Sequence, residues 1–189
     1  MMWLMLDGVS ATVLLVPHCA SVSRNGWAEN HDNRPLSRTG HEQARALARA
    51  VGTDVDAIYT SPTLRCRQTV EPLSAVSGSA LIDLPELYEA AGFHEPAEWV
   101  EGVYAPMGEA VAGAWSAGQA LGALARMVDT HVDGHVVACS HGDVIPVLLS
   151  LLAGAYHTPL PAVVDRGGWY ALQFAAGGLT ITGHSVGNS

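Results

Sequence analysis

Residues 12–21, TVLLVPHCAS, contain an apolar, β-branched run that ends at Pro17 and is followed by His18. A short apolar run of this kind, bounded by a turn signal, is typical of a buried strand. GHVVACSHG, residues 134–142, has the same character and places His141 directly after its apolar run. In open α/β sheets, ligands bind beyond the carboxyl ends of the strands. We therefore expect both histidines at one sheet edge, although 123 residues separate them (141 − 18).

Strand and helix patterns alternate along the rest of the chain, and this alternation predicts an α/β fold with a largely parallel sheet. A broken stretch covers residues 85–104, Gly177-Gly178 is a plausible hairpin turn, and Ser61-Pro62 can cap and begin a helix. The segment 143–153 is apolar nearly all round, so its helix is expected to be internal. The predicted helices are 39–51 (closed by Gly52), 62–75, 107–130 and 143–153, and the further strands are 56–60, 80–83, 168–175 and 179–185.

Length and composition indicate one compact domain spanning residues 1–189, because 49% of the residues are hydrophobic and only 14% are charged. The net charge of −9 argues against nucleic acid as a partner, since phosphate backbones are held by clustered basic residues. No apolar run reaches the roughly 18–20 residues that span a bilayer. The first residues lack the features of a signal peptide, so a cytoplasmic location without membrane contact is expected. Three cysteines without a CxxC pair fit reduced thiols better than a disulfide framework.

Four motifs occur in order: PHCAS at 17–21, NRPLSRTGHEQARALA at 33–48, YTSPTLRCRQTVEPL at 59–73 and ACSHGDVIP at 138–146. Through these motifs the sequence resembles the histidine phosphatase, or phosphoglycerate-mutase-like, superfamily. It looks closest to the small phosphohistidine phosphatases and to the phosphatase domains attached to some Nudix hydrolases. The resemblance implies a three-layer α/β/α fold with a mostly parallel central sheet.

The resemblance also implies roles for individual residues. His18 matches the nucleophile that takes up the phosphoryl group, and neutral imidazole suits this role near pH 7. His141 and Arg65 match residues that bind the phosphate oxygens, for which a guanidinium is well shaped. An acidic residue of the middle segment protonates the leaving group in this family, and Glu89 is the first choice here, with Glu86 second.

The sequence departs from the family at one position of this site. The family has an arginine where this chain has Pro17, and that arginine binds the transferred phosphate. Arg24 is a candidate substitute that would have to swing in toward the site, and Arg67 is also nearby in the sequence. Cys19 and Gly142, which adjoin the two histidines, complete the residues expected at the substrate.

The resulting expectation is a phosphohydrolase that acts on a small phosphomonoester or phosphoramidate through a phosphohistidine intermediate on His18. A reaction through a phosphohistidine needs neither a metal nor an organic cofactor. The histidines outside the motifs follow no metal-ligand spacing, and the three cysteines near the site are interpreted as small buried side chains rather than as part of a Cys/His metal cluster. The departure at Pro17 leaves two alternatives. One is acid–base chemistry on a molecule without phosphate, and the other is a non-catalytic protein that binds a ligand or another protein. The sequence leaves the oligomeric state open.

Overall fold

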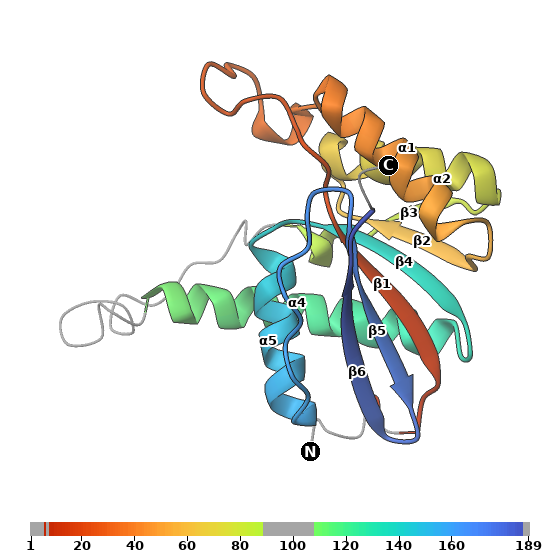
Figure 1. Cartoon of the computed structure of the whole chain (residues 1–189). Coiled ribbons are helices and arrows are strands. Elements are labelled where there is room, and N and C mark those ends of the chain that lie inside the picture. The colour runs from red at the N-terminus through yellow and green to blue at the C-terminus, as the bar shows by residue number, and fades with distance from the viewer. Residues whose placement is uncertain (1–5, 7, 89–107, 187–189) are drawn as a thin grey trace.

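The computed structural model describes residues 6, 8–88 and 108–186, and its centre is a six-stranded sheet with the order β3-β2-β4-β1-β5-β6 (Figure 1). β3, β2, β4 and β1 are parallel neighbours, whereas β5 is antiparallel to both β1 and β6. The sheet is therefore mostly parallel, as expected. The strands are β1 Ala11–Pro17, β2 Ala57–Thr60, β3 Leu81–Asp83, β4 His135–Ser140, β5 Trp169–Ala175 and β6 Gly178–His184.

Helices cover both faces of this sheet and complete a three-layer α/β/α arrangement (Figure 1). One pair packs against one face and a second pair against the other, and two short 3₁₀ turns lie in the connections. The first pair is α1 (Arg38–Val51) and α2 (Leu64–Ser77), the second is α4 (Gly108–Thr130) and α5 (Val144–Tyr156), and the turns are η2 (His31–Asn33) and η3 (Pro85–Leu87).

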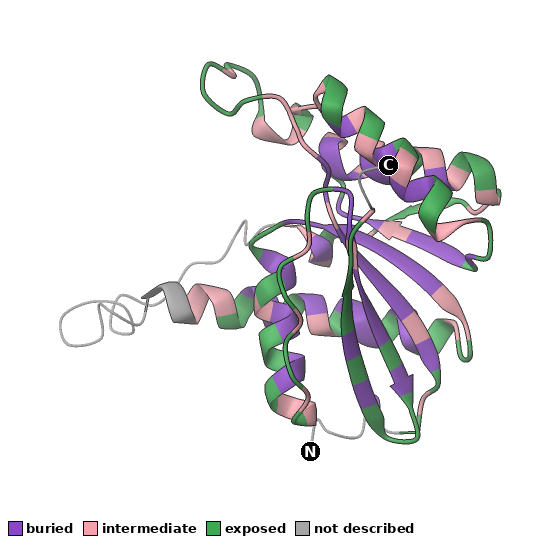
Figure 2. Cartoon of the chain, in the orientation of Figure 1, coloured by how far each residue is buried: buried purple, intermediate pink, exposed green. Residues whose placement is uncertain are grey.

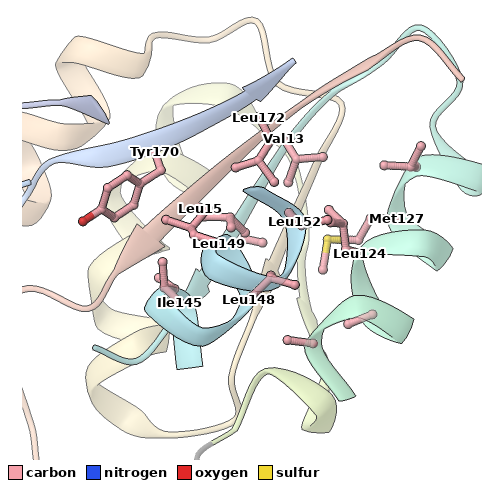
Figure 3. Packing of buried hydrophobic residues seen from close by; sticks show 14 of the residues in the cluster. Val13, Leu15, Leu124, Met127, Ile145, Leu148, Leu149, Leu152, Tyr170 and Leu172 are labelled. Carbon is pink, nitrogen blue, oxygen red and sulfur yellow. The ribbon is translucent and has the colours of Figure 1, made fainter. Parts of the chain in front are cut away.

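The two faces of the sheet bury separate apolar cores. In the larger one, Val13 and Leu15 of β1 pack against residues of α4 and α5 such as Leu124 and Leu148 (Figure 3). In the smaller one, the alternate β1 residue Val16 packs with α1 and α2. Because successive strand residues point to opposite faces, a central strand covered on both sides must be apolar throughout. This requirement explains the continuous apolar run that leads to Pro17.

The start of α1 is fixed by a very close approach to the chain that follows β1. Ser37 caps the helix by accepting a hydrogen bond from the amide of Gly40, and its own amide donates to the carbonyl of Ala20 at 2.9 Å. A Cβ at Gly40 would lie 1.9 Å from that carbonyl oxygen, so only glycine permits this contact. The glycine therefore holds α1 against the segment that carries His18.

Three details differ from the sequence predictions. α2 begins at Leu64 rather than at Pro62, because Ser61 extends the strand ladder and bonds His141 instead of capping the helix. The hairpin turn between β5 and β6 is formed by Ala176 and Gly177, both with positive φ, which is one residue before the predicted Gly177-Gly178. Helix α5 is not internal, since Figure 2 shows one buried stripe and one exposed stripe along it, and Leu151 is 38% exposed.

None of the helices within the described ranges combines the length and the apolar character that crossing a bilayer needs.

Candidate active site

His18 lies immediately after β1, and its ring orientation is set by the backbone that follows it. Its amide continues the ladder by donating to the carbonyl of Ser140 at 2.9 Å. Its Nδ1 lies 2.8 Å from the carbonyl oxygen of Cys19, and this oxygen can only accept. Nδ1 therefore carries the proton, and in the neutral ring the lone pair is on Nε2. This tautomer is the one in which Nε2 can act as a nucleophile.

His141 follows β4, the parallel neighbour of β1, and lies beside His18. The two ring centroids are 5.6 Å apart with an interplanar angle of 70°. The His141 side chain is held on both edges: Nε2 lies 2.8 Å from the Ser61 hydroxyl and Nδ1 lies 3.3 Å from Nη2 of Arg65. Because a guanidinium only donates, Nδ1 accepts and Nε2 donates to Ser61. The strand pattern correctly placed both histidines at one sheet edge.

Arg65 is the largest fully buried side chain of the described residues and projects from the first turn of α2. Besides His141, it reaches loop residue His31, whose carbonyl oxygen accepts from Nη1 at 3.0 Å. A buried guanidinium is costly unless acceptors or negative charge surround it. A phosphoryl group at this position would add both.

A second guanidinium, that of Arg166, contacts His18 from the β5 side of β1, whereas Arg65 contacts His141 at the end of β4. The contact of Arg166 was not expected from the sequence. Its Nη1 donates to the carbonyl of His18 at 3.0 Å and lies 3.5 Å from the carbonyl of Cys19, and its 3.4 Å approach to Nδ1 of His18 is a close contact between two donors rather than a hydrogen bond. Arg166 is in the turn that precedes β5, closed by a hydrogen bond from Gly168 to Asp165 at 2.9 Å. Because β5 is antiparallel to β1, the chain before β5 arrives at the edge where β1 ends. That topological relation is the signal that could have identified Arg166.

The environment of His18 favours its neutral form. Burial is the largest cause that lowers its pKa below the ordinary value of 6.5, and the nearby His141 and Arg166 act in the same direction. Cys66 and the hydrogen bond to the Cys19 carbonyl oppose this, but the net pKa is lowered. His18 is therefore available as a neutral nucleophile near pH 7.

Cys19 supports the site through its backbone rather than its side chain. The side chain is fully buried in a small cluster with Leu36 and Ala44, and burial raises the pKa of its thiol to about 11. Its amide donates to Thr69 at 3.0 Å, and its carbonyl oxygen fixes His18. The thiol stays protonated and lies in the apolar layer beneath the site.

The structure places Gly142 directly after His141 but leaves Arg24 and Arg67 away from His18. Gly142 is exposed directly after His141, with open space around its Cα. Arg24 is exposed in the loop after β1, and no hydrogen bond or ion pair among the described residues joins it to His18. Arg67 forms an ion pair with Asp83 at the end of β3. The structure therefore brings neither of the two expected substitute arginines to His18.

Of the two candidate acids, Glu86 is among the residues that the structure describes. Glu89 lies outside the described residues. Glu86 lies in η3 and forms an ion pair with Arg126 of α4 at 2.6 Å, rather than a contact with either site histidine. Sequence reasoning also missed Tyr88, whose ring meets that of His141 edge-on with centroids 5.9 Å apart and whose hydroxyl bonds Asp32. Its position next to Glu89 is the only sequence signal that pointed to it.

Within residues 6, 8–88 and 108–186, no group of three histidine, cysteine or acidic side chains is arranged to hold a metal ion. The three cysteines are buried and free.

Comparison with known proteins identifies the class to which this fold and site belong. The sequence profile of the histidine phosphatase superfamily (branch 1) matches residues 13–186. This match covers most of the chain, so the protein belongs to the histidine phosphatase superfamily. The resemblance seen in the four motifs is thereby confirmed.

One relative is similar to part of this chain in sequence. An 8-oxo-(d)GTP phosphatase of Mycolicibacterium smegmatis is 33% identical over 81 residues, which are 42% of this chain and 25% of the relative. The matched segment thus spans about a quarter of that protein's length.

Two solved structures share the fold. One is phosphoserine phosphatase from Entamoeba histolytica in complex with 3-phosphoglyceric acid, with a TM-score of 0.68, 14% identity and coverage of 93% of this chain and 97% of that one. The other is phosphoglycerate mutase from Bacillus anthracis strain Sterne, with a TM-score of 0.65, 16% identity and 93% coverage of both chains. At these identities, the likeness concerns the fold.

Proposed function

We propose that the protein is a phosphohydrolase that transfers the phosphoryl group of a small phosphomonoester or phosphoramidate to Nε2 of His18 and then to water. The observation that carries this proposal is the hydrogen bond from Nδ1 of His18 to the Cys19 carbonyl, which leaves the lone pair on Nε2. Family membership and the phosphatases among its relatives support the same chemistry.

In the first step, the Nε2 lone pair forms a bond to phosphorus while the bond from phosphorus to the leaving oxygen or nitrogen breaks. A carboxylic acid donates its proton to the leaving group, and we assign this role to Glu89. Arg65 and His141 bind the phosphoryl oxygens. A dianionic group beside His141 favours protonation of its Nδ1, which converts that atom from an acceptor into a donor.

In the second step, a water oxygen attacks phosphorus, the N–P bond breaks, and the water proton returns to the carboxylate. Inorganic phosphate leaves, and His18 recovers its neutral Nε2. Throughout both steps the Nδ1 proton stays on its hydrogen bond to Cys19, so this carbonyl stabilises the positive charge on the phosphorylated ring.

The test uses p-nitrophenyl phosphate and a panel of metabolite phosphates with the wild type, His18→Ala and the matched control His135→Ala. His135 begins β4, at the sheet edge opposite the site, and contacts Asp54. Loss of a nucleophile should lower kcat by about 10⁴-fold or more. Mass spectrometry of rapidly quenched wild type should find a phosphoryl adduct on the peptide that contains His18.

Equal activity of His18→Ala and His135→Ala would contradict the proposal. A wild type without activity and without adduct, combined with a gain of activity in Pro17→Arg, would instead support the repurposed or non-catalytic alternatives.

A further inference from the structure

We propose that Arg166 is a second phosphate-binding residue of this site, which contacts the oxygens of the phosphoryl group while that group is transferred to His18. This inference rests on the proposed function and adds one phosphate-binding residue to it. The structural basis is the position of the Arg166 guanidinium, within 3.0–3.5 Å of three atoms of His18 and Cys19.

The end of β1 offers no such donor itself. Pro17 lacks both a backbone N–H and a polar side chain. The amide of His18 points to β4, so by strand alternation the backbone of Pro17 faces the β5 side. The last pair that joins β1 to β5 is Leu15 with Tyr170, and beyond it the two strands separate. The side chain of Arg166 enters beside this end of β1.

The turn that carries Arg166 is tightly constrained. Gly167, the third residue of the turn, has φ +91°, a conformation that glycine adopts without strain. A Cβ at Gly168 would lie 2.4 Å from the carbonyl oxygen of His184 and one at Gly167 would lie 3.2 Å from Cβ of Gln43. The turn is thus packed between β6 and α1. It presents Arg166 from a fixed base, which reduces the entropy lost when the side chain binds a ligand.

The side chain still has donors for a substrate. Nη1 contacts the two backbone carbonyls, whereas the guanidinium has three nitrogens and five N–H groups in all. Because Arg166 is an exposed residue, its remaining N–H groups can turn toward a phosphoryl group on Nε2 of His18. The phosphoryl group would then lie between two guanidinium groups, with Arg65 on the His141 side and Arg166 on the His18 side.

This arrangement also reconciles an acidic protein with an anionic substrate. The chain carries a net charge of −9, which repels phosphate at long range, but local charges decide binding inside a pocket. Two arginines beside two histidines create a positive site on this negative surface.

The test compares Arg166→Gln, Arg166→Ala and Arg166→Lys with the matched control Arg38→Ala. Arg38 is on α1, its side chain is 96% exposed, and it forms an ion pair with Glu42 on the surface. Arg166→Gln removes the charge and shortens the side chain by two bonds, whereas Arg166→Lys keeps a charge, so the pair separates loss of charge from loss of the guanidinium's contacts with His18 and Cys19. Orthovanadate and inorganic phosphate binding are measured by calorimetry, and turnover is measured with p-nitrophenyl phosphate.

We expect Arg166→Gln and Arg166→Ala to lose about 10²–10³-fold in kcat/KM and to bind orthovanadate about tenfold more weakly or worse. Arg166→Lys should lose less, because it keeps the charge but not the forked geometry. Added guanidinium ion should partly restore the activity of Arg166→Ala. A purely structural tether would behave differently, since Arg166→Lys and Arg166→Gln would then bind orthovanadate equally well, whatever the charge at this position.

Failure of the inference and failure of the proposed function give different results. If the wild type forms a phosphoryl adduct on His18 and Arg166→Gln turns over and binds orthovanadate like Arg38→Ala, the role of Arg166 is overturned while the function stands. If the wild type forms no adduct, anion binding still decides the matter: weaker binding in Arg166→Gln than in Arg38→Ala supports the inference. Equal binding, or none in the wild type, overturns it.

Discussion

The ring of His18 stands edge-on to the ring of His141, with centroids 5.6 Å apart, at the ends of two parallel strands that are direct neighbours in the sheet. Each ring is fixed by a different acceptor: His18 by the Cys19 carbonyl and His141 by the Ser61 hydroxyl. The two histidines therefore hold complementary tautomers, one with a free Nε2 and the other with Nε2 bound. The different roles that we propose for the two histidines follow from the groups that bind their ring nitrogens, because the rings themselves are chemically identical.

Ser61→Ala should lower kcat by about 10–100-fold, because it removes the hydrogen bond, worth roughly 1–3 kcal/mol, that holds the Nε2 edge of His141. Steady-state kinetics with p-nitrophenyl phosphate measure the effect. Ser61→Thr, which retains the hydroxyl, should preserve more of the activity. If Ser61→Ala and the wild type have the same kcat, the hydrogen bond from His141 to Ser61 does not matter for turnover.

Arg65→Met should remove the stabilisation of the protein by inorganic phosphate. A ligand that binds only the folded state raises the free energy of unfolding, by about 2.7 kcal/mol at a hundred times its Kd. Methionine fills similar space without the charge, so the variant should fold but show no rise in Tm with phosphate. Thermal unfolding with and without phosphate measures this, with Arg38→Ala as the control. A similar rise in Tm in Arg65→Met would remove Arg65 from the phosphate site.

Gly40→Ala should destabilise the fold by about 2–4 kcal/mol, because its Cβ would meet the Ala20 carbonyl at 1.9 Å and the backbone must shift. Gly118 on α4 provides the matched control, since a Cβ there meets nothing within 4 Å. Gly118→Ala should stabilise by about 0.5–1 kcal/mol through helix propensity. Urea unfolding of both variants measures the two effects. Equal changes in both would show that the close approach of α1 to the β1 segment is not required.

The pKa of His18 should lie below 6.5 in an NMR titration of the folded protein, because burial, His141 and Arg166 outweigh the opposing effects of Cys66 and the Cys19 carbonyl. The resonance is assigned by its absence in His18→Ala. As pH falls through 6.5, the unfolded chain takes up a proton at this residue while the folded state does not. Stability is therefore lost between 6.5 and the lowered pKa, and no further below it. Arg166→Gln should move the His18 pKa upward, whereas an unchanged or lower value would contradict the charge effect.

Features that depend on local pattern could be predicted from the sequence. The apolar run before His18 and the one before His141 each required a strand covered on both faces, and the parallel arrangement then placed both histidines at one edge. Arg65 was identified through its motif, and the structure buries it against His141.

Two kinds of contact could not be predicted: those that depend on the direction of a strand, and those in which two groups compete for the same hydrogen bond. Arg166 reaches His18 only because β5 runs antiparallel to β1, and an apolar strand pattern does not encode direction. Arg24 and Arg67 are nearer to the motifs in sequence, yet one lies on the exposed loop and the other pairs with Asp83. Ser61 resembled a helix cap, but His141 competes for its hydroxyl.

The contact between Arg166 and His18 joins residues that are 148 positions apart, and this has a consequence for synthesis on the ribosome. The chain emerges from its N-terminus at about 5–20 residues per second, so the nucleophile is exposed well before its second arginine. Long-range pairings of this kind also form late in folding, since the loop must close first. The contact between Arg166 and His18 is therefore completed only when the C-terminal hairpin docks beside β1, and a nascent or truncated chain would present His18 without Arg166.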